Sequence, residues 1–350
     1  MNQRIVQFGI IGTGAIAEIH AEALSRASQA KLVAVYDQNP TRSAAFSERH
    51  NCRAAADLTS FLASDVEAVT IATPSGLHAE VAIPAARAGK HILCEKPLEV
   101  TTAKIDLLIA ACEEAGVLLS AVFQSRFAAN VRLIKQAVDA GRFGTPVFAA
   151  ATMQWYRTPE YYNSASWRGT MALDGGGALM NQGIHTVDLL LHLNGEVAEV
   201  SCHTARRLHH GIEVEDTAAA LLRFANGSFG AIAAGTACAP GFPRRVELVG
   251  TGGSVTLEDD RITRWVFAEE RPEDAAIRAG GGKGEGITGG SSRPNAMSCE
   301  GHRRQIEELA AAILERRPLS VSGREGRRAV ELITACYESA ASGQPVILRS

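Results

Sequence analysis

Lys96 is placed to act on a reacting oxygen. It belongs to the tripeptide Glu95-Lys96-Pro97, which directly follows the apolar run 91–94. An ammonium group at a strand end could hydrogen-bond a substrate hydroxyl and stabilise a developing alkoxide. Burial or nearby cations could lower its pKa toward working pH, and Glu95 could oppose that fall by pairing with it. From spacing alone, a surface Glu–Lys pair ahead of a helix is the commoner arrangement.

His185 is a second candidate for proton transfer, because imidazole titrates near neutral pH. It lies in the segment GGGALMNQGIHTVD at 175–188, for which the pattern predicts a helix over 177–193. In that helix Asn181 and His185 are i,i+4 neighbours, and Asp188 and His192 continue the polar stripe. Such a stripe either faces solvent or points into a site. A structural histidine with satisfied hydrogen bonds is the alternative interpretation.

A glycine-rich turn predicts binding of a dinucleotide. The pattern Gly12-x-Gly14-x-x-Ala17 follows the β-rich run 6–11 and opens a helical segment. Gly12 permits the tight turn, Gly14 lets the backbone approach a pyrophosphate, and Ala17 is small enough for the helix to pack on the strand. The helix N-terminus supplies unpaired N–H groups for the phosphates. The predicted contacts are Gly12, Thr13, Gly14, Ala15 and Ile16.

An acidic residue at the end of the next strand favours NAD. Asp37 lies 23 residues after Gly14, where a carboxylate accepts hydrogen bonds from the adenosine ribose and would repel a 2′-phosphate. Arg42 is the nearest cation and keeps NADP binding open. The alternative interpretation is an ordinary strand–helix turn in which Asp37 caps the helix.

The segment ATPSGLH at 72–78 follows the third apolar run. It is therefore predicted at the carboxyl edge of the sheet, where doubly wound folds bind their ligands. Thr73, Pro74 and Ser75 are candidates to pack against the cofactor. His78 is a further cofactor-binding candidate, although a histidine at a helix N-terminus is more often structural.

These elements predict an α/β protein of two domains. In residues 1–125, continuous apolar runs alternate with helical segments, which indicates a Rossmann domain with a doubly wound parallel sheet. Longer strand-like runs follow at 146–156, 197–203, 215–224 and 228–234. Asn226-Gly227 is a strong hairpin signal between the last two. Residues 126–350 are therefore predicted to form an α+β domain with an open, mostly antiparallel sheet.

Aromatic and basic residues are concentrated just before the predicted helix at 177. Aromatic faces and a guanidinium suit sugar binding, but core packing is the alternative for at least half of these side chains. The residues are Trp155, Arg157, Tyr161, Tyr162 and Trp167.

Composition excludes several classes of partner and site. The chain has 350 residues and a formal net charge of −3, which gives no attraction to nucleic acid or an anionic membrane. Seven scattered cysteines without a C-x-x-C pair argue against disulfides and zinc and favour a reducing cytoplasm; no metal is expected. There is no secretory signal pattern and no apolar run of the ~20 residues that a membrane span needs. The Gly-rich stretch 279–296 is expected to be a loop, either inert or a lid.

Together these motifs closely resemble the Gfo/Idh/MocA oxidoreductase family. The matching pieces are GIIGTGAIA at 9–17, ATPSGLH at 72–78, EKP at 95–97 and GGGALMNQGIHTVD at 175–188. The resemblance implies that Lys96 is the active-site lysine and His185 the acid/base histidine, with Glu95 and Lys96 on the nicotinamide side. It also implies cofactor contacts from Trp167-Arg168 and a position near the nicotinamide for Gln124 and Arg126. A homodimer or homotetramer through the C-terminal sheet is expected.

The sequence departs from the family at one position. Many polyol dehydrogenases of the family carry an aspartate four residues before the histidine, where this chain has Asn181. An Asp–His dyad is therefore absent at that spacing, which makes inositol dehydrogenase itself a weaker interpretation. The expected reaction is hydride transfer between the nicotinamide of NAD(P) and a carbinol carbon of a sugar, polyol or sugar derivative. The candidate substrate contacts are Lys96, Arg126, Trp155, Arg157, Tyr161, Asn181 and His185.

Two other functions are compatible with the same motifs. One is redox-neutral processing of a glycoside with a retained NAD, which is oxidised and reduced again within one turnover. The other is a non-catalytic NAD-sensing regulator. The presence of both Lys96 and His185 argues against a sensor, which needs neither.

Overall fold

The computed structural model describes residues 4–280 and 298–348, which divide into two compact units. The first unit comprises residues 1–124 and 299–327, and the second comprises residues 125–298 and 328–350. The predicted domains, 1–125 and 126–350, differ from this division at 299–327. That segment belongs to the first unit because its helix packs on the apolar core of that unit. Most of the Gly-rich stretch predicted as a loop or lid, residues 281–296, lies outside the described residues.

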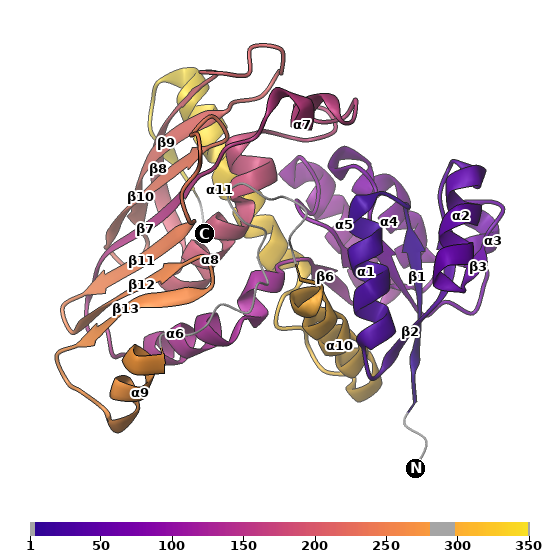
Figure 1. Ribbon diagram of the computed structural model, residues 1–350, viewed down its shortest axis with the longest axis horizontal. Helices are drawn as coiled ribbons and strands as arrows, with labels where there is room; N and C mark the ends of the chain where they lie inside the picture. Colours follow the sequence, from indigo (N-terminus) through magenta and orange to yellow (C-terminus); the bar gives the residue numbers. More distant parts are fainter. Residues whose placement is uncertain (1–3, 281–297, 349–350) are drawn as a thin grey trace. The chain divides into compact units, whose positions relative to one another are not determined.

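The first unit is built on a six-stranded parallel sheet in the order β3-β2-β1-β4-β5-β6. Figure 1 labels strands β1, β2, β3 and β6 of this sheet. Its strands β1, β4 and β5 are almost entirely buried, as expected for strands covered on both faces. The Rossmann prediction is therefore confirmed. The strands are β1 Val6–Ile11, β2 Ala30–Tyr36, β3 Arg53–Ala54, β4 Ala68–Ile71, β5 His91–Cys94 and β6 Leu119–Ala121.

The helices that connect these strands follow the predicted order. They are α1 Ala15–Arg26, α2 Pro40–His50, α3 Leu58–Leu62, α4 His78–Arg87 and α5 Thr102–Ala115. A short 3-10 helix, η1 Ser75–Leu77, precedes α4, and a second, η2 Gln124–Phe127, follows β6. The carboxyl ends of the strands are thus each followed by a short turn or loop, which is where the candidate residues lie.

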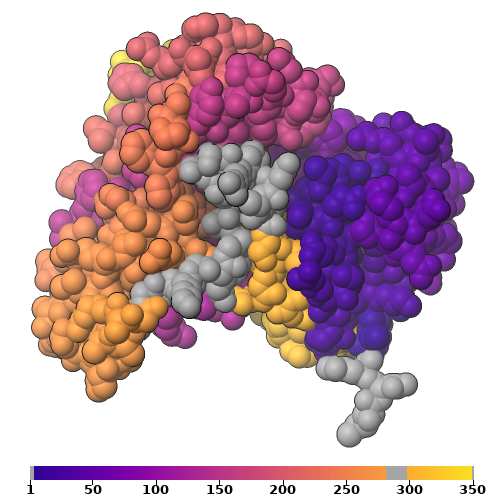
Figure 2. All heavy atoms as spheres, in the orientation of Figure 1, coloured from indigo at the N-terminus to yellow at the C-terminus, as the bar shows by residue number. Residues whose placement is uncertain are grey.

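Helix α10 (Glu300–Glu315) belongs to the first unit although it is remote in sequence. Its buried residues Ile306 and Leu309 share one core with Ala21 and Leu24 of α1. Figure 2 shows the atoms of this segment directly against those of the N-terminal helix. In addition, the side-chain amide of Gln305 donates to the carbonyl oxygen of Ala121, at 2.6 Å, and so anchors α10 to β6.

The second unit contains an eight-stranded sheet in the order β13-β12-β11-β7-β10-β9-β8-β14. Only β7 and β10 pair in parallel, so the prediction of a mostly antiparallel sheet is confirmed. The predicted hairpin at Asn226-Gly227 joins β9 to β10. The strands are β7 Pro146–Gln154, β8 Val197–Ala205, β9 Thr217–Phe224, β10 Phe229–Gly235, β11 Arg245–Gly250, β12 Gly253–Glu258, β13 Arg261–Phe267 and β14 Val346–Ile347.

Helix α8 packs on one face of this sheet, against β7 and β11 (Figure 1). The apolar residues of α8 are almost all buried, because the helix has the sheet on one side and α6 on another. The helices of the second unit are α6 Ala129–Asp139, α7 Pro159–Asn163, α8 Ile184–Asn194 and α9 Pro272–Gly280; α11 Gly323–Ser342 begins in the first unit and continues into the second.

The predicted single helix over 177–193 is wrong in its first third. Residues Ala178–Gly183 form a π-helix, η3, and α8 begins only at Ile184. The carbonyl oxygen of Gly177 accepts from the N–H groups of both Asn181 and Gln182, at 3.1 and 3.3 Å, so the i+4 bond competes with an i+5 bond. Asn181 and His185 are therefore not neighbours on one regular α-helix.

Neither disulfides nor membrane-spanning helices occur in the described part of the chain. All seven cysteines are free, in agreement with the sequence pattern. Among the described residues no helix combines the length and apolarity needed to cross a membrane.

Candidate active site

The glycine-rich turn lies at the switch point of the parallel sheet, between the neighbouring strands β1 and β4. Gly12 has φ +95°, and a Cβ on it would lie 2.7 Å from the carbonyl oxygen of Ala72, so only glycine fits. A Cβ on Gly14 would meet no described atom within 4 Å. The N-terminus of α1 carries no side-chain cap, which leaves its N–H groups available for phosphate oxygens. These features fit a dinucleotide pyrophosphate.

Asp37 organises this turn through hydrogen bonds to Thr13 and Asn39. Its Oδ2 accepts hydrogen bonds from the N–H and the hydroxyl of Thr13, at 2.8 and 2.7 Å, and its Oδ1 accepts from the N–H of Asn39. A carboxylate offers about four acceptor directions, so it can still accept from a hydroxyl. Asn39, rather than Asp37, caps α2 by accepting from the N–H of Arg42, which excludes the simple capping interpretation.

The turn after β4 is tied to the loop after β5 by His78. Its Nδ1 lies 2.9 Å from the carbonyl oxygen of Pro97 and its Nε2 lies 3.0 Å from that of Thr73, and the ring is buried. Burial lowers the pKa of His78. The neutral ring has one N–H, which can donate to either of these carbonyls, so His78 lies between the two loops and is hydrogen-bonded to one of them. Ser75 is buried beside it, while Thr73 and Pro74 remain partly exposed.

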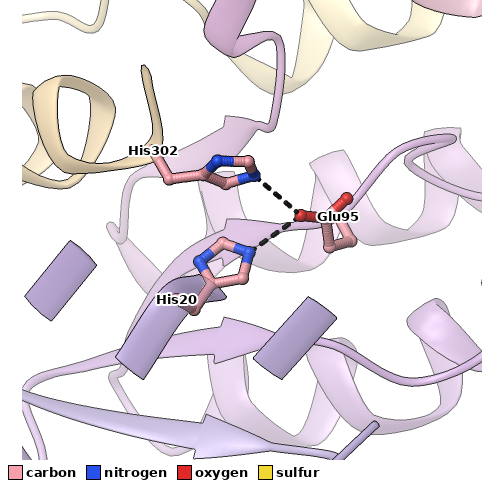
Figure 3. A group of neighbouring side chains, drawn as sticks. All are labelled: His20, Glu95 and His302. Atoms are coloured by element: carbon pink, nitrogen blue, oxygen red, sulfur yellow. Dashed lines mark hydrogen bonds and ion pairs between the residues drawn. The ribbon is translucent and has the colours of Figure 1, made fainter. Parts of the chain in front are cut away.

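Glu95 ends β5 and is the centre of a buried cluster with two histidines (Figure 3). Its Oε1 lies 2.8 Å from Nε2 of His20, on α1, and 3.5 Å from Nε2 of His302, on α10. Its Oε2 accepts the N–H of Lys96 at 3.1 Å. Burial alone raises the pKa of Glu95, but the hydrogen bonds from His20 and His302 outweigh it and hold that pKa well below its usual range.

A hydrogen-bonded network in the second unit surrounds Asn181. The amide of Asn181 donates to Asp174 and its Oδ1 accepts from Nε2 of Gln182 at 2.9 Å. Gln182 also donates to the hydroxyl of Tyr161, at 2.8 Å, and its Oε1 accepts from Nε and Nη2 of Arg157, at 3.2 and 2.9 Å. The orientation of Asn181 is therefore fixed from both sides of its amide.

Guanidinium groups stack on the aromatic side chains of the same region. Arg157 lies 4.9 Å from the ring centre of Trp155, and Arg168 lies 4.3 Å from that of Tyr161 and 4.6 Å from that of Trp167. Burial lowers the pKa of Arg157 and raises that of Tyr161. These contacts are cation–π in character. Trp155 and Arg157 are buried, as is Tyr162, whose hydroxyl is hydrogen-bonded to Thr236 at 2.8 Å, so these three side chains pack in the core. Tyr161, Trp167 and Arg168 are partly exposed.

Arg126 is committed to a buried ion pair. Its Nε and Nη2 donate to the two carboxylate oxygens of Asp188, at 2.9 and 2.6 Å, and both side chains are buried. The polar stripe predicted on the helix therefore includes one residue, Asp188, that faces an arginine. Gln124 is also buried, whereas His185, in the first turn of α8, is half-buried.

The two residues proposed for proton transfer belong to different units: Lys96, partly exposed, follows β5 in the first, and His185 opens α8 in the second. Sequence reasoning did not single out His20, His302, Asp174 or Gln182. His20 lies three residues after Ala17 on the buried face of α1, a helical spacing that could have signalled its burial. His302 gave no such signal, because its partner is 207 residues away.

Glu215 was assigned no role from the sequence, yet it supports the segment from Gly177 to Leu179. Its carboxylate accepts from the N–H groups of Gly177 and Leu179, at 3.0 and 2.8 Å, and from the hydroxyl of Tyr337 at 2.9 Å. Burial raises the pKa of Glu215. Through these bonds it fixes the start of the π-helix that carries Asn181.

Known proteins resemble the chain over its whole length. A family model described as an oxidoreductase family with an NAD-binding Rossmann fold matches residues 6–123, and the GFO/IDH/MocA C-terminal domain model matches residues 131–256. Myo-inositol 2-dehydrogenase of Thermotoga maritima is 30% identical over 76% of this chain and 79% of the relative.

Solved structures extend this likeness. The WlbA dehydrogenase of Bordetella pertussis, in complex with NADH and UDP-GlcNAcA, matches with a TM-score of 0.89 at 33% identity, covering 100% of this chain and 99% of that one. Levoglucosan dehydrogenase in complex with NADH and levoglucosan matches with a TM-score of 0.85 at 25% identity, covering 99% and 100%.

Proposed function

Because the chain belongs to the Gfo/Idh/MocA family of oxidoreductases, we propose that it transfers a hydride between NAD and a carbinol carbon of a sugar, polyol or sugar derivative. The observation that carries this function is the turn Gly12–Gly14 at the switch point of the sheet, ahead of a helix N-terminus without a side-chain cap. The related enzymes include a myo-inositol 2-dehydrogenase and a levoglucosan dehydrogenase, whose names are those of enzymes that oxidise a polyol and an anhydrosugar.

The cofactor site is assigned to residues at the carboxyl edge of the parallel sheet. Asp37 would accept from the adenosine ribose, which favours NAD, and exposed Arg42 is the cation nearest to a 2′-phosphate. Bound NAD supplies the carbon that accepts or donates the hydride. The assigned residues are Gly12, Thr13, Gly14, Ala15, Ile16, Asp37, Arg42, Thr73, Pro74, Ser75, His78, Glu95, Lys96, Gln124, Trp167 and Arg168.

Three side chains are assigned to the reacting groups of the substrate. In the oxidation direction His185 takes the hydroxyl proton, and Lys96 hydrogen-bonds the same oxygen as negative charge develops on it. Asn181 holds a neighbouring hydroxyl, and its contacts with Asp174 and Gln182 fix the amide for that role. Since Asn181 is neutral, the cation formed on His185 is not stabilised by a carboxylate at that position.

The substrate surface is assigned to the second unit. The partly exposed Tyr161 would offer an aromatic face with a polar edge, which suits the alternating apolar and hydroxyl surfaces of a sugar ring, and the buried Trp155 and Arg157 would support it from the core. Arg126 is held in a buried ion pair with Asp188, so its contribution to substrate binding would be indirect.

The protein is proposed to be a cytoplasmic homo-oligomer, a dimer or tetramer, that associates through the sheet of the second unit. Phe229, Phe148 and Val249 are register partners on the adjacent strands β10, β7 and β11 and share one exposed face. Leu221 on β9 is 70% exposed. A continuous apolar row of this kind on a sheet face is typical of a protein–protein interface.

The test combines cofactor titration with a substrate screen. Purified protein is expected to bind NADH, detected by fluorescence, and to turn over a member of a panel of sugars, glycosides and nucleotide sugars, followed by absorbance at 340 nm and by product mass. Lys96→Ala should lower kcat by at least about 100-fold, whereas Lys31→Ala, at an exposed position of β2, should leave it unchanged. Absent NADH binding, or unchanged turnover in Lys96→Ala, contradicts the proposal.

The mass measurement separates hydride transfer from redox-neutral processing. A dehydrogenase changes absorbance at 340 nm in proportion to product. An enzyme that retains its NAD and restores it within each turnover changes the product mass with no net absorbance change. The latter result would replace the proposed net reaction while leaving the cofactor site intact.

A further inference from the structure

The cluster of His20, Glu95 and His302 lies outside the residues assigned to cofactor and substrate, apart from Glu95 itself. The two imidazoles come from helices α1 and α10, far apart in sequence, and point at one carboxylate oxygen (Figure 3). Both rings are almost completely buried and meet edge to face, with centres 4.8 Å apart. Burying two histidines and a carboxylate costs free energy, so a role that offsets this cost is expected for the cluster.

The distances favour a hydrogen-bonded cluster over a metal centre. Two ligands on one tetrahedral zinc ion, each ~2.1 Å from it, lie roughly 3.4 Å apart. The Nε2 atom of His20 is only 2.8 Å from Oε1 of Glu95, which is an ordinary hydrogen bond. Both imidazoles also address the same oxygen rather than enclosing a common centre.

The charge distribution fits two neutral imidazoles around one carboxylate. Each Nε2–H donates toward Oε1, and the Nδ1 atoms of His20 and His302 are buried without a hydrogen-bond partner among the described residues. A proton on either Nδ1 would therefore be an unsatisfied buried donor. Burial lowers the pKa of His20, which also favours the neutral form of its ring. Glu95 remains ionised, with one oxygen held by the histidines and the other by the chain itself.

That second oxygen connects the cluster to Lys96. Oε2 of Glu95 accepts the backbone N–H of Lys96, at 3.1 Å. The carboxylate therefore holds the peptide group between Glu95 and Lys96 in place. His20 lies on α1, the helix whose N-terminus is assigned to the pyrophosphate. One rigid cluster thus links the helix that would carry the phosphates to the residue that would act beside the nicotinamide.

We propose that His20 and His302 are positioning residues, which fix the carboxylate of Glu95 and through it the backbone of Lys96. This rests on the proposed function only in placing Lys96 beside the nicotinamide. A hydrogen bond that orients a catalytic group acts through geometry, because displacement of about 1 Å is enough to impair its action. α10 accordingly contributes to the site of the first unit from the far end of the chain.

The test compares His302→Gln with His302→Met. The two side chains have nearly the same length and shape, but only glutamine retains an N–H donor for Glu95. The readout is the rate at which acetic anhydride acetylates each lysine, measured by peptide mass spectrometry with and without saturating NADH. The chain has only six lysines, and Lys90 and Lys104, in the same unit, serve as internal controls.

In the wild type, NADH is expected to protect Lys96 from acetylation. His302→Met should weaken that protection at least about fivefold and His302→Gln less than about twofold, with Lys90 and Lys104 unchanged. His20→Met and His20→Gln repeat the comparison from α1, so a folding failure of one methionine variant leaves the other. Kd for NADH and Tm are recorded for each variant.

The outcomes separate the two proposals. If NADH does not protect Lys96 in the wild type, the proposed function fails at Lys96. If it does protect, but the methionine and glutamine variants protect equally, the positioning role is overturned, even where Tm falls. Binding of one equivalent of added Zn²⁺ by the wild type, lost in His302→Met, would also overturn it in favour of a metal centre.

Discussion

The parallel sheet of the first unit is buried on both faces, whereas the mixed sheet of the second unit leaves one face exposed. Strands β4 and β5 are buried almost throughout, while β9 alternates strictly between buried and exposed residues. A sheet without a free face can place functional groups only beyond its strand ends, where Gly12, Asp37 and Glu95 lie. A sheet with a free face can use alternate residues along every strand.

The units also differ in how they hold buried charge. Glu95 in the first unit is bound by the imidazole of His20, whose pKa burial lowers, and Asp188 in the second is bound by a guanidinium, whose charge is permanent. Unfolding therefore exposes a group that gains a proton near neutral pH in the first arrangement but not in the second. Variants can therefore be chosen that disturb one unit, one sheet or one kind of charge pair at a time.

The largest expected effect is loss of the permanent pair in the second unit. Asp188→Asn removes the carboxylate that faces the buried guanidinium of Arg126 and should lower the free energy of unfolding by about 3–5 kcal/mol. Urea unfolding followed by circular dichroism measures it. The control is Asp139→Asn, which breaks the exposed pair with Lys135 and should cost less than about 1 kcal/mol. Equal losses of unfolding free energy in both variants would show that burial does not determine the cost of breaking an ion pair in this protein.

The next effect concerns the strand ends of the first unit. Gly12→Val places a side chain against the carbonyl of Ala72 at a φ of +95°, so the turn must move and the affinity for NADH should fall by about 100-fold. Fluorescence titration measures it. Gly89→Ala is the matched control, because Gly89 also has positive φ but a Cβ there meets no described atom within 4 Å. NADH affinity retained in Gly12→Val would remove the turn from the site.

The structural features behind these predictions could be recognised from the sequence to different degrees. The strands β1, β2, β4, β5 and β6 of the parallel sheet were predicted closely, because strands buried on both faces are continuous apolar runs. The two-residue strands β3 and β14 were missed, and β14 pairs with the remote strand β8. Strands β11 and β13 were also missed, although each pairs with β12 across a short turn. The dinucleotide turn was recognisable because its chemistry is local, with Gly12 and Gly14 two residues apart in the chain.

The π-helix, the packing of α10 and the contact of His302 with Glu95 were missed because they depend on contacts between distant segments. The π-helix at 178–183 begins where Glu215 binds the N–H groups of Gly177 and Leu179, which no local pattern encodes. In the same way, α10 joins the first unit through apolar contacts with α1, and His302 meets Glu95 only after the chain has folded. Local patterns predicted the elements, and long-range hydrogen bonds determined their exact form.

A smaller effect tests the exposed face of the mixed sheet. Phe229→Glu puts a charge in the middle of the apolar row formed with Phe148 and Val249 and should raise the dissociation constant of the oligomer by about tenfold or more. Light scattering coupled to size-exclusion chromatography measures it across a dilution series, and NADH affinity should not change. Leu107→Glu is the control, an exposed apolar position on α5 of the other unit. Dissociation by Leu107→Glu instead would move the interface to the first unit.

The smallest effect is the pH response of the titratable cluster. His20 is buried, and burial lowers its pKa, so the unfolded chain takes up a proton near pH 6.5 that the folded first unit does not. The stabilisation is complete above that pH and is lost as the pH falls below it. Between pH 7 and pH 6 the loss should be less than about 1.4 kcal/mol. The groups that face His20 are the carboxylate of Glu95 and the ring of His302. Hydrogen exchange resolved by unit should show the loss in the first unit, and His20→Gln should remove His20's share of it. If the pH dependence of exchange protection is unchanged in His20→Gln, or appears equally in the second unit around Arg126 and Asp188, other groups cause the pH response. The proposed difference between the two kinds of charge pair would then be wrong.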